Sequence, residues 1–405
     1  MSYTPSKKIL DKYADVLVKC ALNGGSGIKK GEVVLLQVHE CAKPMLFALR
    51  NAVLRAGGHT ITHFFPDGDS RYSYAREFYD IASEEQLKFF PEKLLKGRIE
   101  QIDHSIYILS DYKKYELKGI EPKKILATQT AFFPYRKWSE EKENKGKYTW
   151  VIALYGTPAM AKDVGLTEKE YWGEIIKACY LNEKNPTNKW KSIMSSIHLL
   201  KKKLNALKIK KLHIVSKGTD LWVGIGKNRK WLGGRGRNIP SFEVFISPDF
   251  RETQGHISFN KPLYHYGNRI DGIKLWFKNG HIIKATAKKN AKLLKEMIAQ
   301  KGANMVGEYS LTDARMSKIT KFMGTTLFDE NVGGREGNTH IAIGNAYKDS
   351  YIGDPSKVPS AKWKKMGFNE SPIHTDIIST ERRIVTAVLP NGRERVIYKN
   401  GMFLL

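Results

Sequence analysis

The chain has 405 residues, of which 41% are hydrophobic and 11% aromatic, enough to bury one large or two medium-sized cores. Its charged fraction of 27% is near the globular average and argues against global disorder. No apolar run approaches the roughly 20 residues that span a bilayer. The N-terminal residues mix charged with apolar positions and lack the apolar core of a signal peptide. We therefore expect a cytoplasmic protein that contacts no membrane.

The cysteines and the net charge bear on compartment and partners. Cys20, Cys41 and Cys179 are widely spaced and odd in number, which is typical of a reducing compartment and argues against disulfides or a thiolate zinc site. The formal net charge is +27, a value that raises the question of a nucleic-acid partner. Because the positive residues are spread along the whole chain and no nucleic-acid-binding motif accompanies them, we interpret the charge as a generally basic surface.

The N-terminal half alternates helix and strand patterns. Apolar residues recur at helical spacing over 6–22 and 43–55, and short β-branched runs occur between such segments. The expected strands are 33–38, HTITHF, SIYIL and TWVIALY, and two further helices are expected at 167–180 and 187–207. Apolar strands that alternate with helices predict a mainly parallel α/β sheet.

From about residue 212 the pattern changes to short strands and hairpins. KLHIVS and DLWVGIG read as strands, and Asn279-Gly280 and Asn391-Gly392 mark the turns of two hairpins. One helix is expected at 289–300. We therefore predict two domains, a parallel α/β domain over residues 1–210 and a mostly antiparallel, β-rich α+β domain over 211–405.

Familiar cofactor and nucleophile motifs are absent from the chain. There is no GxGxxG after a strand, no Walker loop, no GxSxG and no HExxH. The GGRGR segment at 233–237 lacks a strand–loop–helix context, so we interpret it as a tight turn.

Carboxylates and imidazoles in apolar or glycine-rich settings are the informative features, and all lie in the second half. Glu243 sits in a strand-like apolar run, where a carboxylate must face water or have a partner. His374 and Asp376 are two residues apart, so on a strand both project from one face. Each feature alone is ordinary, since strand glutamates usually face water and His–x–Asp pairs are usually hydrogen-bonded neighbours.

Taken together, these groups form a candidate ligand set. The set consists of Glu243, Glu308, Glu330, His340, His374 and Asp376. Carboxylate oxygens and imidazole nitrogens suit Zn, Co or Mn. Six ligands, several of them carboxylates able to bridge, suit two divalent metal ions about 3.5–4 Å apart.

At these residues the sequence resembles the thermophilic aminopeptidase T and aminopeptidase S family of metallopeptidases. The resemblance runs through nearly the whole chain. In order, the segments that carry it are KYADVLVKCALN, KKGEVVLLQV, AVLRAGGHT, NIPSFEVF, GIKLWFKNG, the Gly-Glu of Glu308, TLFDEN, HIAIGNAY and HTD. It implies a metallo-aminopeptidase that removes N-terminal residues from peptides with a water activated by two metals. It also implies a homodimer.

Carried over residue by residue, the resemblance puts the metal ligands on the six residues named above, in the domain over 211–405. It gives catalytic roles to Glu308, near the bridging water, and to Tyr347, as a hydrogen-bond donor to the oxyanion. One departure concerns Glu330, because ten positions separate it from His340, more than the family pattern has. The glycine-rich segment 331–339 can form a loop that leaves both ligands in place, or it can displace Glu330.

Three other interpretations stay open. A basic nucleic-acid-binding protein on an α/β scaffold is supported by the charge alone. A metal-dependent amidase or dipeptidase would use the same ligand set on a different substrate. An inactive family member is conceivable because of the segment 331–339.

Overall fold

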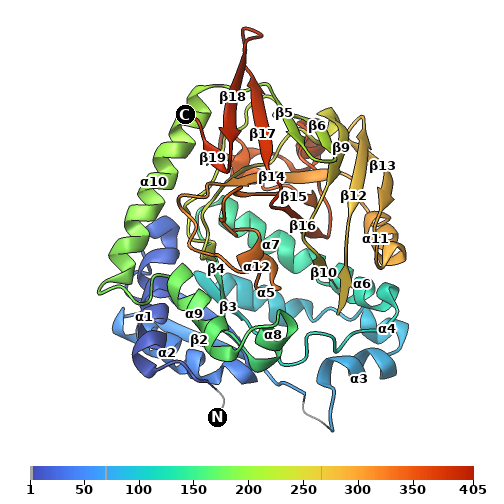
Figure 1. The fold of residues 1–405 in the computed structure, drawn as a ribbon. Coiled ribbons are helices and arrows are strands. Elements are labelled where there is room, and N and C mark those ends of the chain that lie inside the picture. Colours follow the sequence, from blue (N-terminus) through green and yellow to red (C-terminus); the bar gives the residue numbers. More distant parts are fainter. Residues whose placement is uncertain (1–2, 69–70, 266) are drawn as a thin grey trace. The chain divides into compact units, whose positions relative to one another are not determined.

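The computed structural model describes residues 3–68, 71–265 and 267–405 (Figure 1). Contacts within the chain divide it into two compact units. Unit 1 runs to Ser195 and also takes in Gly234–Ser241 and Lys321–Phe328, and unit 2 comprises Ser196–Gly233, Phe242–Thr320 and Asp329–Leu405. A single domain boundary near residue 210 therefore stays a prediction. Among the described helices, none has both the length and the apolar character needed to cross a membrane.

Unit 1 contains the predicted parallel sheet. Its strands are β1 (Val33–His39), β2 (His59–Phe65), β3 (His104–Leu109), β4 (Thr149–Leu154) and β7 (Asn238–Ile239), in the order β2-β1-β3-β4-β7. Every neighbouring pair is parallel. In β1, Val34, Leu35 and Leu36 are consecutive and buried, as expected for a strand covered on both faces. The two-residue strand β7 is too short for any sequence pattern to predict.

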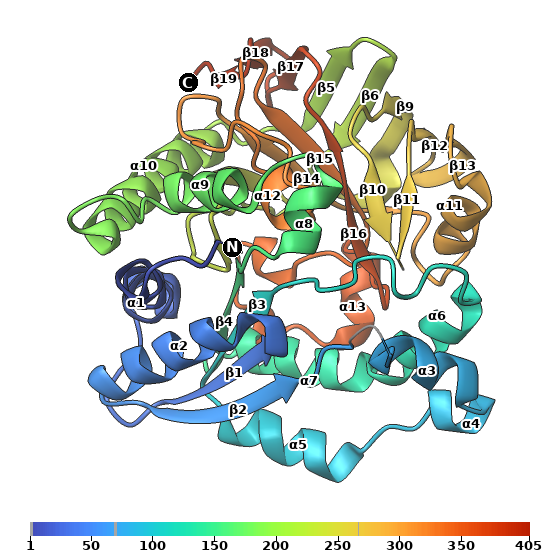
Figure 2. The ribbon, with the colours of Figure 1, turned by 60° about the horizontal axis from the view of Figure 1, so that its bottom comes forward.

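Helices flank this sheet on both faces. The helices that lie wholly in unit 1 are α1 (Lys7–Val16), α2 (Lys43–Arg55), α3 (Tyr74–Ile81), α4 (Glu84–Leu87), α5 (Glu92–Gln101), α6 (Pro122–Ala131), α7 (Phe133–Asn144), α8 (Pro158–Asp163) and α9 (Glu168–Ala178), whereas α10 (Pro186–Ala206) begins in unit 1 and ends in unit 2. Figure 2 shows α2 on one side of β1 and β2 and α5 on the other. In α5, Ile99 packs against Leu35 of β1 in one apolar cluster. The predicted helix over 43–55 is confirmed to the residue as α2.

Unit 2 is built mainly from antiparallel strands. Its larger sheet has the order β13-β12-β9-β6-β5-β17-β18-β19 and its smaller sheet the order β16-β15-β14-β8. The strands of the larger sheet are β5 (Lys211–Ser216), β6 (Thr219–Gly224), β9 (Thr253–Ser258), β12 (Lys274–Lys278), β13 (His281–Thr286), β17 (Arg383–Val388), β18 (Glu394–Lys399) and β19 (Met402–Phe403). Those of the smaller sheet are β8 (Glu243–Ile246), β14 (Val306–Thr312), β15 (Asn338–Gly344) and β16 (His374–Ser379). Short elements complete the unit, namely β10 (Leu263–His265), β11 (Asn268–Ile270), α11 (Ala291–Ile298) and α13 (Ser360–Lys365).

Both predicted hairpins form. Asn279 and Gly280 connect β12 to β13 with φ of 50° and 77°, and Gly392, with φ of 81°, lies in the turn between β17 and β18. Asn and Gly tolerate such left-handed conformations, which match the twist of the paired strands. The predicted division into a parallel α/β part and an antiparallel α+β part is therefore confirmed.

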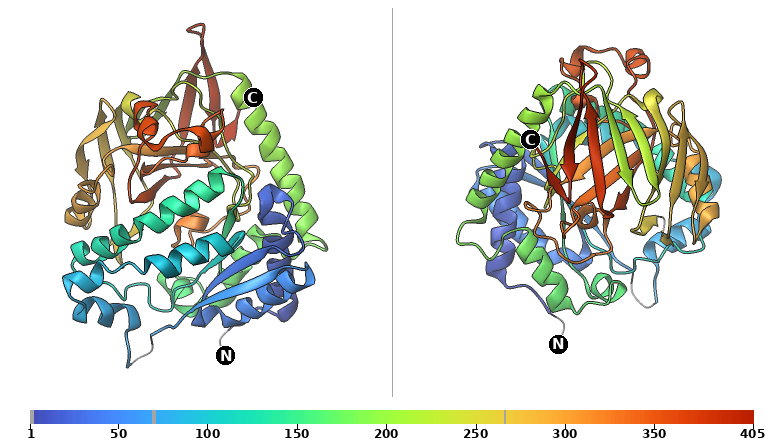
Figure 3. Two further views of the ribbon diagram at one scale, coloured as in Figure 1. Left: turned by 180° about the vertical axis from the view of Figure 1, so that it is seen from behind. Right: turned by 45° about the horizontal axis from the view of Figure 1, so that its top comes forward.

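The larger and the smaller sheet of unit 2 pack face to face (Figure 3). Arg383 of β17 donates through Nη2 to the carbonyl of Ser379 in β16, at 2.8 Å. The hydroxyl of Tyr398 in β18 donates to the carbonyl of Thr312 in β14, also at 2.8 Å. The larger sheet thus covers one face of the smaller sheet, and the other face of the smaller sheet is left for the candidate ligands.

A β-bulge at Gly307 sets the register of β14. Val306 pairs with Ile343 but Glu308 pairs with Ala342, so Gly307 is the extra residue. A Cβ at Gly307 would lie 2.2 Å from the backbone oxygen of Asn345, which only glycine avoids.

We predict that Gly307→Ala lowers the free energy of unfolding by about 1–3 kcal/mol, the usual cost of overpacking. Gly97→Ala in α5 is the matched control, because its added Cβ meets nothing within 4 Å and alanine is the better helix former. Chemical denaturation of both variants measures the difference. Equal stabilities for the two variants would contradict the close approach at Gly307.

Candidate metal centre

Five of the six predicted ligands lie on one face of the smaller sheet of unit 2. They are Glu243 on β8, Glu308 on β14, His340 on β15, and His374 and Asp376 on β16. Directly opposed residues of antiparallel strands point to the same face. Ala342 is opposed by Glu308 on one side and by Asp376 on the other, and Ser310 is opposed by His340. Strand pairing therefore gathers side chains that are far apart in sequence.

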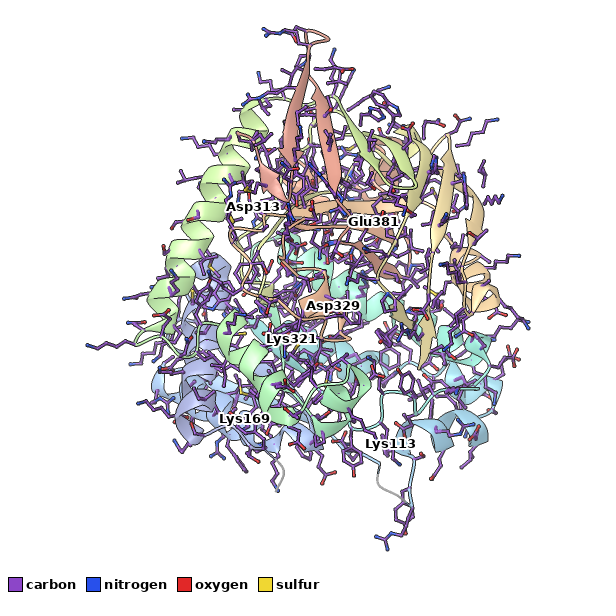
Figure 4. The ribbon with its side chains drawn as sticks, viewed as in Figure 1. Lys113, Lys169, Asp313, Lys321, Asp329 and Glu381 are labelled. Carbon is purple, nitrogen blue, oxygen red and sulfur yellow. The ribbon has the colours of Figure 1, made fainter. Side chains whose placement is uncertain are left out.

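The sixth predicted ligand, Glu330, directly follows α12 (Thr326–Asp329), and Figure 4 labels Asp329 at the end of this helix. The side chain of Asn338, at the start of β15, donates to the carbonyl of Asp329 at 2.7 Å. This bond closes the glycine-rich segment into a loop. Ligand atoms of Glu330, His340 and Asp376 all lie within 4.8 Å of one another. The structure therefore brings Glu330 next to two of the other predicted ligands, and its role as a ligand stays a prediction.

His340 lies at the centre of the cluster and is buried, with 2% of its surface exposed. Its Nε2 is 3.1 Å from Glu308 Oε1, 3.3 Å from Glu243 Oε2 and 3.8 Å from Asp376 Oδ1. Ligand atoms of Glu243, Glu308 and His340 form a second group within 4.8 Å. In the part of the chain that the structure describes, these two groups are the only ones of this kind, and both belong to unit 2.

Glu308 lies between the two imidazoles. Its Oε1 faces His340 Nε2 at 3.1 Å, and its Oε2 faces His374 Nε2 at 3.6 Å. Asp376 Oδ1 is likewise 3.5 Å from His374 Nε2. The Nδ1 of His374 donates to the carbonyl of Asn345 at 2.7 Å, which directs Nε2 towards the carboxylates. Glu308 and Asp376 therefore each lie within 4 Å of both imidazoles.

The electrostatics of the cluster show an excess of buried negative charge. Burial raises the pKa of Glu243 to about 7; His340 opposes this rise and the charge of Glu308 adds to it. Burial, followed by the charge of Glu243, also raises the pKa of Glu330 well above its usual range. The pKa of His340 is well above its ordinary value because its hydrogen bond to Glu308 and the neighbouring carboxylates outweigh burial. Cations therefore fit this donor set, since they would supply the charge that the imidazoles do not.

Tyr347 lies beside the cluster. Its ring centroid is 5.0 Å from that of His374 and 5.6 Å from that of Phe245. Its backbone N–H donates to Ser247 Oγ at 2.8 Å. Tyr347, which the resemblance predicts to be catalytic, therefore lies against the candidate ligand His374.

Three residues next to the ligands were not predicted from the sequence. Ser310 Oγ donates to Glu243 Oε2 at 2.8 Å. Asn331 accepts from the Phe242 N–H at 2.7 Å and donates weakly to Glu330 Oε1 at 3.4 Å. Asn345 supplies the carbonyl that orients His374. Ser310 lies two residues after Glu308, so on a strand it shares a face with that ligand. Asn331 lies in the TLFDEN motif and Asn345 in the HIAIGNAY motif. A search of the sequence for polar residues near the predicted ligands could therefore have found all three.

Buried carboxylates and imidazoles gathered on one rigid sheet define a metal-dependent enzyme site. The family model of the thermophilic metalloproteases (M29) matches residues 6–403. The chain belongs to this family of peptide hydrolases.

Individual relatives are similar over their full lengths. Aminopeptidase PepS of Streptococcus thermophilus is 28% identical, with 98% of each chain covered. Aminopeptidase T of Thermus thermophilus is also 28% identical, with 98% of this chain and 99% of the relative covered. The solved structure of wild-type AmpT from Thermus thermophilus matches with a TM-score of 0.82 and 26% identity, over 98% of this chain and all of that one (100%). The fold described above is therefore the fold of this family.

We predict that the cation-free protein loses stability as the pH rises from about 4.5 to about 7, the ordinary and the folded-state pKa of Glu243. A carboxyl group whose pKa is higher in the folded state binds more protons there, so the free energy of unfolding falls between the two values. Burial alone would raise the pKa of Asp376, but the charge of His374 and its hydrogen bond outweigh burial and lower that pKa from 3.8. Asp376 therefore titrates below this pH window.

Thermal unfolding in the presence of a chelator measures this dependence. Glu243→Gln removes one of the two carboxyl groups whose pKa is raised and should make the curve less steep, while Glu330 keeps part of the dependence. A variant as pH-dependent as the wild type would assign the effect to other groups.

Proposed function

We propose that the protein is an aminopeptidase that hydrolyses N-terminal residues from peptides with two divalent cations, of Zn, Co or Mn. The observation that carries the proposal is the placement of Glu308 and Asp376 between two imidazoles. The proposed ligands are Glu243, Glu308, Glu330, His340, His374 and Asp376. The printed names of the relatives, which are aminopeptidases, support the substrate class.

When bound, two divalent cations lower the pKa of a shared water towards neutrality and polarise the scissile carbonyl. The four carboxylates would match the four positive charges of such a pair and would hold it away from bulk water. Glu308 is the proposed proton acceptor, because its two oxygens face the space between His340 and His374. Accepting the proton of the nucleophilic water next to the reacting carbon is general base catalysis.

Tyr347 is the proposed donor to the oxyanion. A phenol supplies one O–H donor, and the ring contact with His374 keeps it beside the cluster. A donor already held in place before the reaction stabilises the charge of the tetrahedral intermediate without reorganisation. The backbone bond from Tyr347 to Ser247 restrains the segment that carries the phenol.

The remaining proposals concern setting and assembly. We propose a cytoplasmic homodimer whose catalytic part is the domain over residues 211–405. All three cysteines are free thiols, which supports a reducing compartment. Peptides are the proposed partners, and the basic charge is taken as a general surface property.

We predict that exhaustive chelation abolishes hydrolysis of leucyl amide, and that Zn, Co or Mn restores it. The reason is that the buried carboxylates cannot polarise a carbonyl without cations. Amidase and dipeptidase alternatives are separated by N-acylated substrates, because an aminopeptidase must lose activity when the α-amine is blocked. Full activity in protein shown by elemental analysis to be free of metal would refute the proposal.

We predict that Tyr347→Phe lowers kcat by roughly 10²–10³ while metal content and KM stay near wild type. The substitution keeps the ring contacts and removes the hydroxyl alone. If the phenol only packs, kcat is unchanged and stability falls by the loss of one hydrogen bond, about 1 kcal/mol. Steady-state kinetics with metal analysis distinguishes the two results, and loss of metal would instead place Tyr347 among the ligands.

A further inference from the structure

Ser310 occupies the centre of the ligand-bearing face without being a ligand. It lies on β14 two residues after Glu308, so both side chains point to the same face. His340 of β15 opposes it on one side and Phe245 of β8 on the other. Its exposed fraction is 0%, and a buried hydroxyl must find a hydrogen-bond partner.

The partner of this hydroxyl is a candidate ligand. Ser310 Oγ donates to Glu243 Oε2 at 2.8 Å, and the same oxygen lies 3.3 Å from His340 Nε2. A serine hydroxyl has a single proton to donate, and here it is directed to a carboxylate. The carboxylate oxygen that faces the central imidazole is therefore the one that Ser310 holds.

Glu243 has a structural need for such a restraint. It is the first residue of β8, a strand of four residues at the edge of the smaller sheet. A glutamate at the start of a short edge strand keeps several rotatable bonds, and fixing them costs conformational entropy. The neighbouring strand supplies the restraint through Ser310, whose own backbone is paired on both sides.

Thr339 shows what a hydroxyl with only a structural role does in the same sheet. It lies on β15 next to His340, with 1% of its surface exposed. Its Oγ1 donates to the backbone carbonyl of Ser310 at 2.6 Å, and its side chain belongs to the opposite face of the sheet. Ser310 and Thr339 are thus two buried hydroxyls at one level of the sheet, of which only one bonds a candidate ligand.

We propose that Ser310 is a positioning residue of the metal centre, whose hydroxyl holds the Glu243 carboxylate in the orientation that binds a divalent cation beside His340. The proposal rests on the proposed metal-dependent function. Hydrogen-bond partners of metal ligands orient them and tune their affinity, and losing one such partner typically weakens metal binding about 10–100-fold.

The test is a titration of the metal-stripped, full-length protein with Zn in competition with a chromophoric chelator. Ser310→Ala is expected to bind at least one Zn about 10–100-fold more weakly than wild type. Ser310→Thr, which retains the hydroxyl, should restore most of the affinity. Thr339→Val is the matched control, because it removes the other buried hydroxyl and should leave Zn affinity near wild type.

A second readout separates positioning from packing. Thermal unfolding of the cation-free proteins should respond similarly to Ser310→Ala and Thr339→Val, whereas only Ser310→Ala should shift the Zn concentration needed for half-maximal peptidase activity. If Ser310→Ala does not fold, Ser310→Val, which has the shape of Ser310→Thr without the hydroxyl, takes its place with the same expectation.

Wild-type affinity in Ser310→Ala, or an equal loss in Thr339→Val, would overturn the inference and leave the proposed function intact. A wild-type protein that binds no divalent cation would overturn both. The two failures are distinguishable because the first concerns a difference between variants and the second concerns wild type alone.

Discussion

Crowding of buried carboxylates around two imidazoles is the constraint on which this structure depends. Glu243, Glu308, Glu330 and Asp376 approach one another in a region from which water is largely excluded. Such an arrangement is unfavourable for separate charges, and it persists because the scaffold around it is rigid. Burial and the neighbouring carboxylates accordingly raise the pKa of Glu243 and of Glu330.

The rigidity comes from the two packed sheets of unit 2. The face of the smaller sheet that bears no ligands is covered by the larger sheet, whose Arg383 and Tyr398 bond the backbone of β16 and β14. Side chains on strands of a packed sheet are positioned more precisely than side chains on loops. The bulge at Gly307 then sets the register that places Glu308 opposite Ala342. Glu330 alone comes from a connecting segment, and Asn331 and Asn338 tie that segment to neighbouring backbone.

Features governed by local chemistry could be predicted from the sequence. The Asn-Gly hairpins, the helix over 43–55 and the strand that carries His374 and Asp376 all follow from residues close together in the chain. The family resemblance predicted that ligands far apart in the sequence belong to one site. Their spacing in the sequence alone could not predict this. The features that were not predicted depend on long-range register: the two-residue strand β7, the bulge at Gly307, and the bond between Ser310 and Glu243, which are 67 positions apart.

The order of strands in the smaller sheet, β16-β15-β14-β8, has a consequence for how the chain folds. Its first and last ligands, Glu243 and Asp376, stand on opposite edge strands, and closing the long chain segments between such strands is slow. Short zinc-binding modules fold around their ion because the ligands are close in sequence. Here a cation can find its ligands together only after the sheet has assembled. By mass action such a cation would stabilise the assembled native state, and not one short segment of the chain.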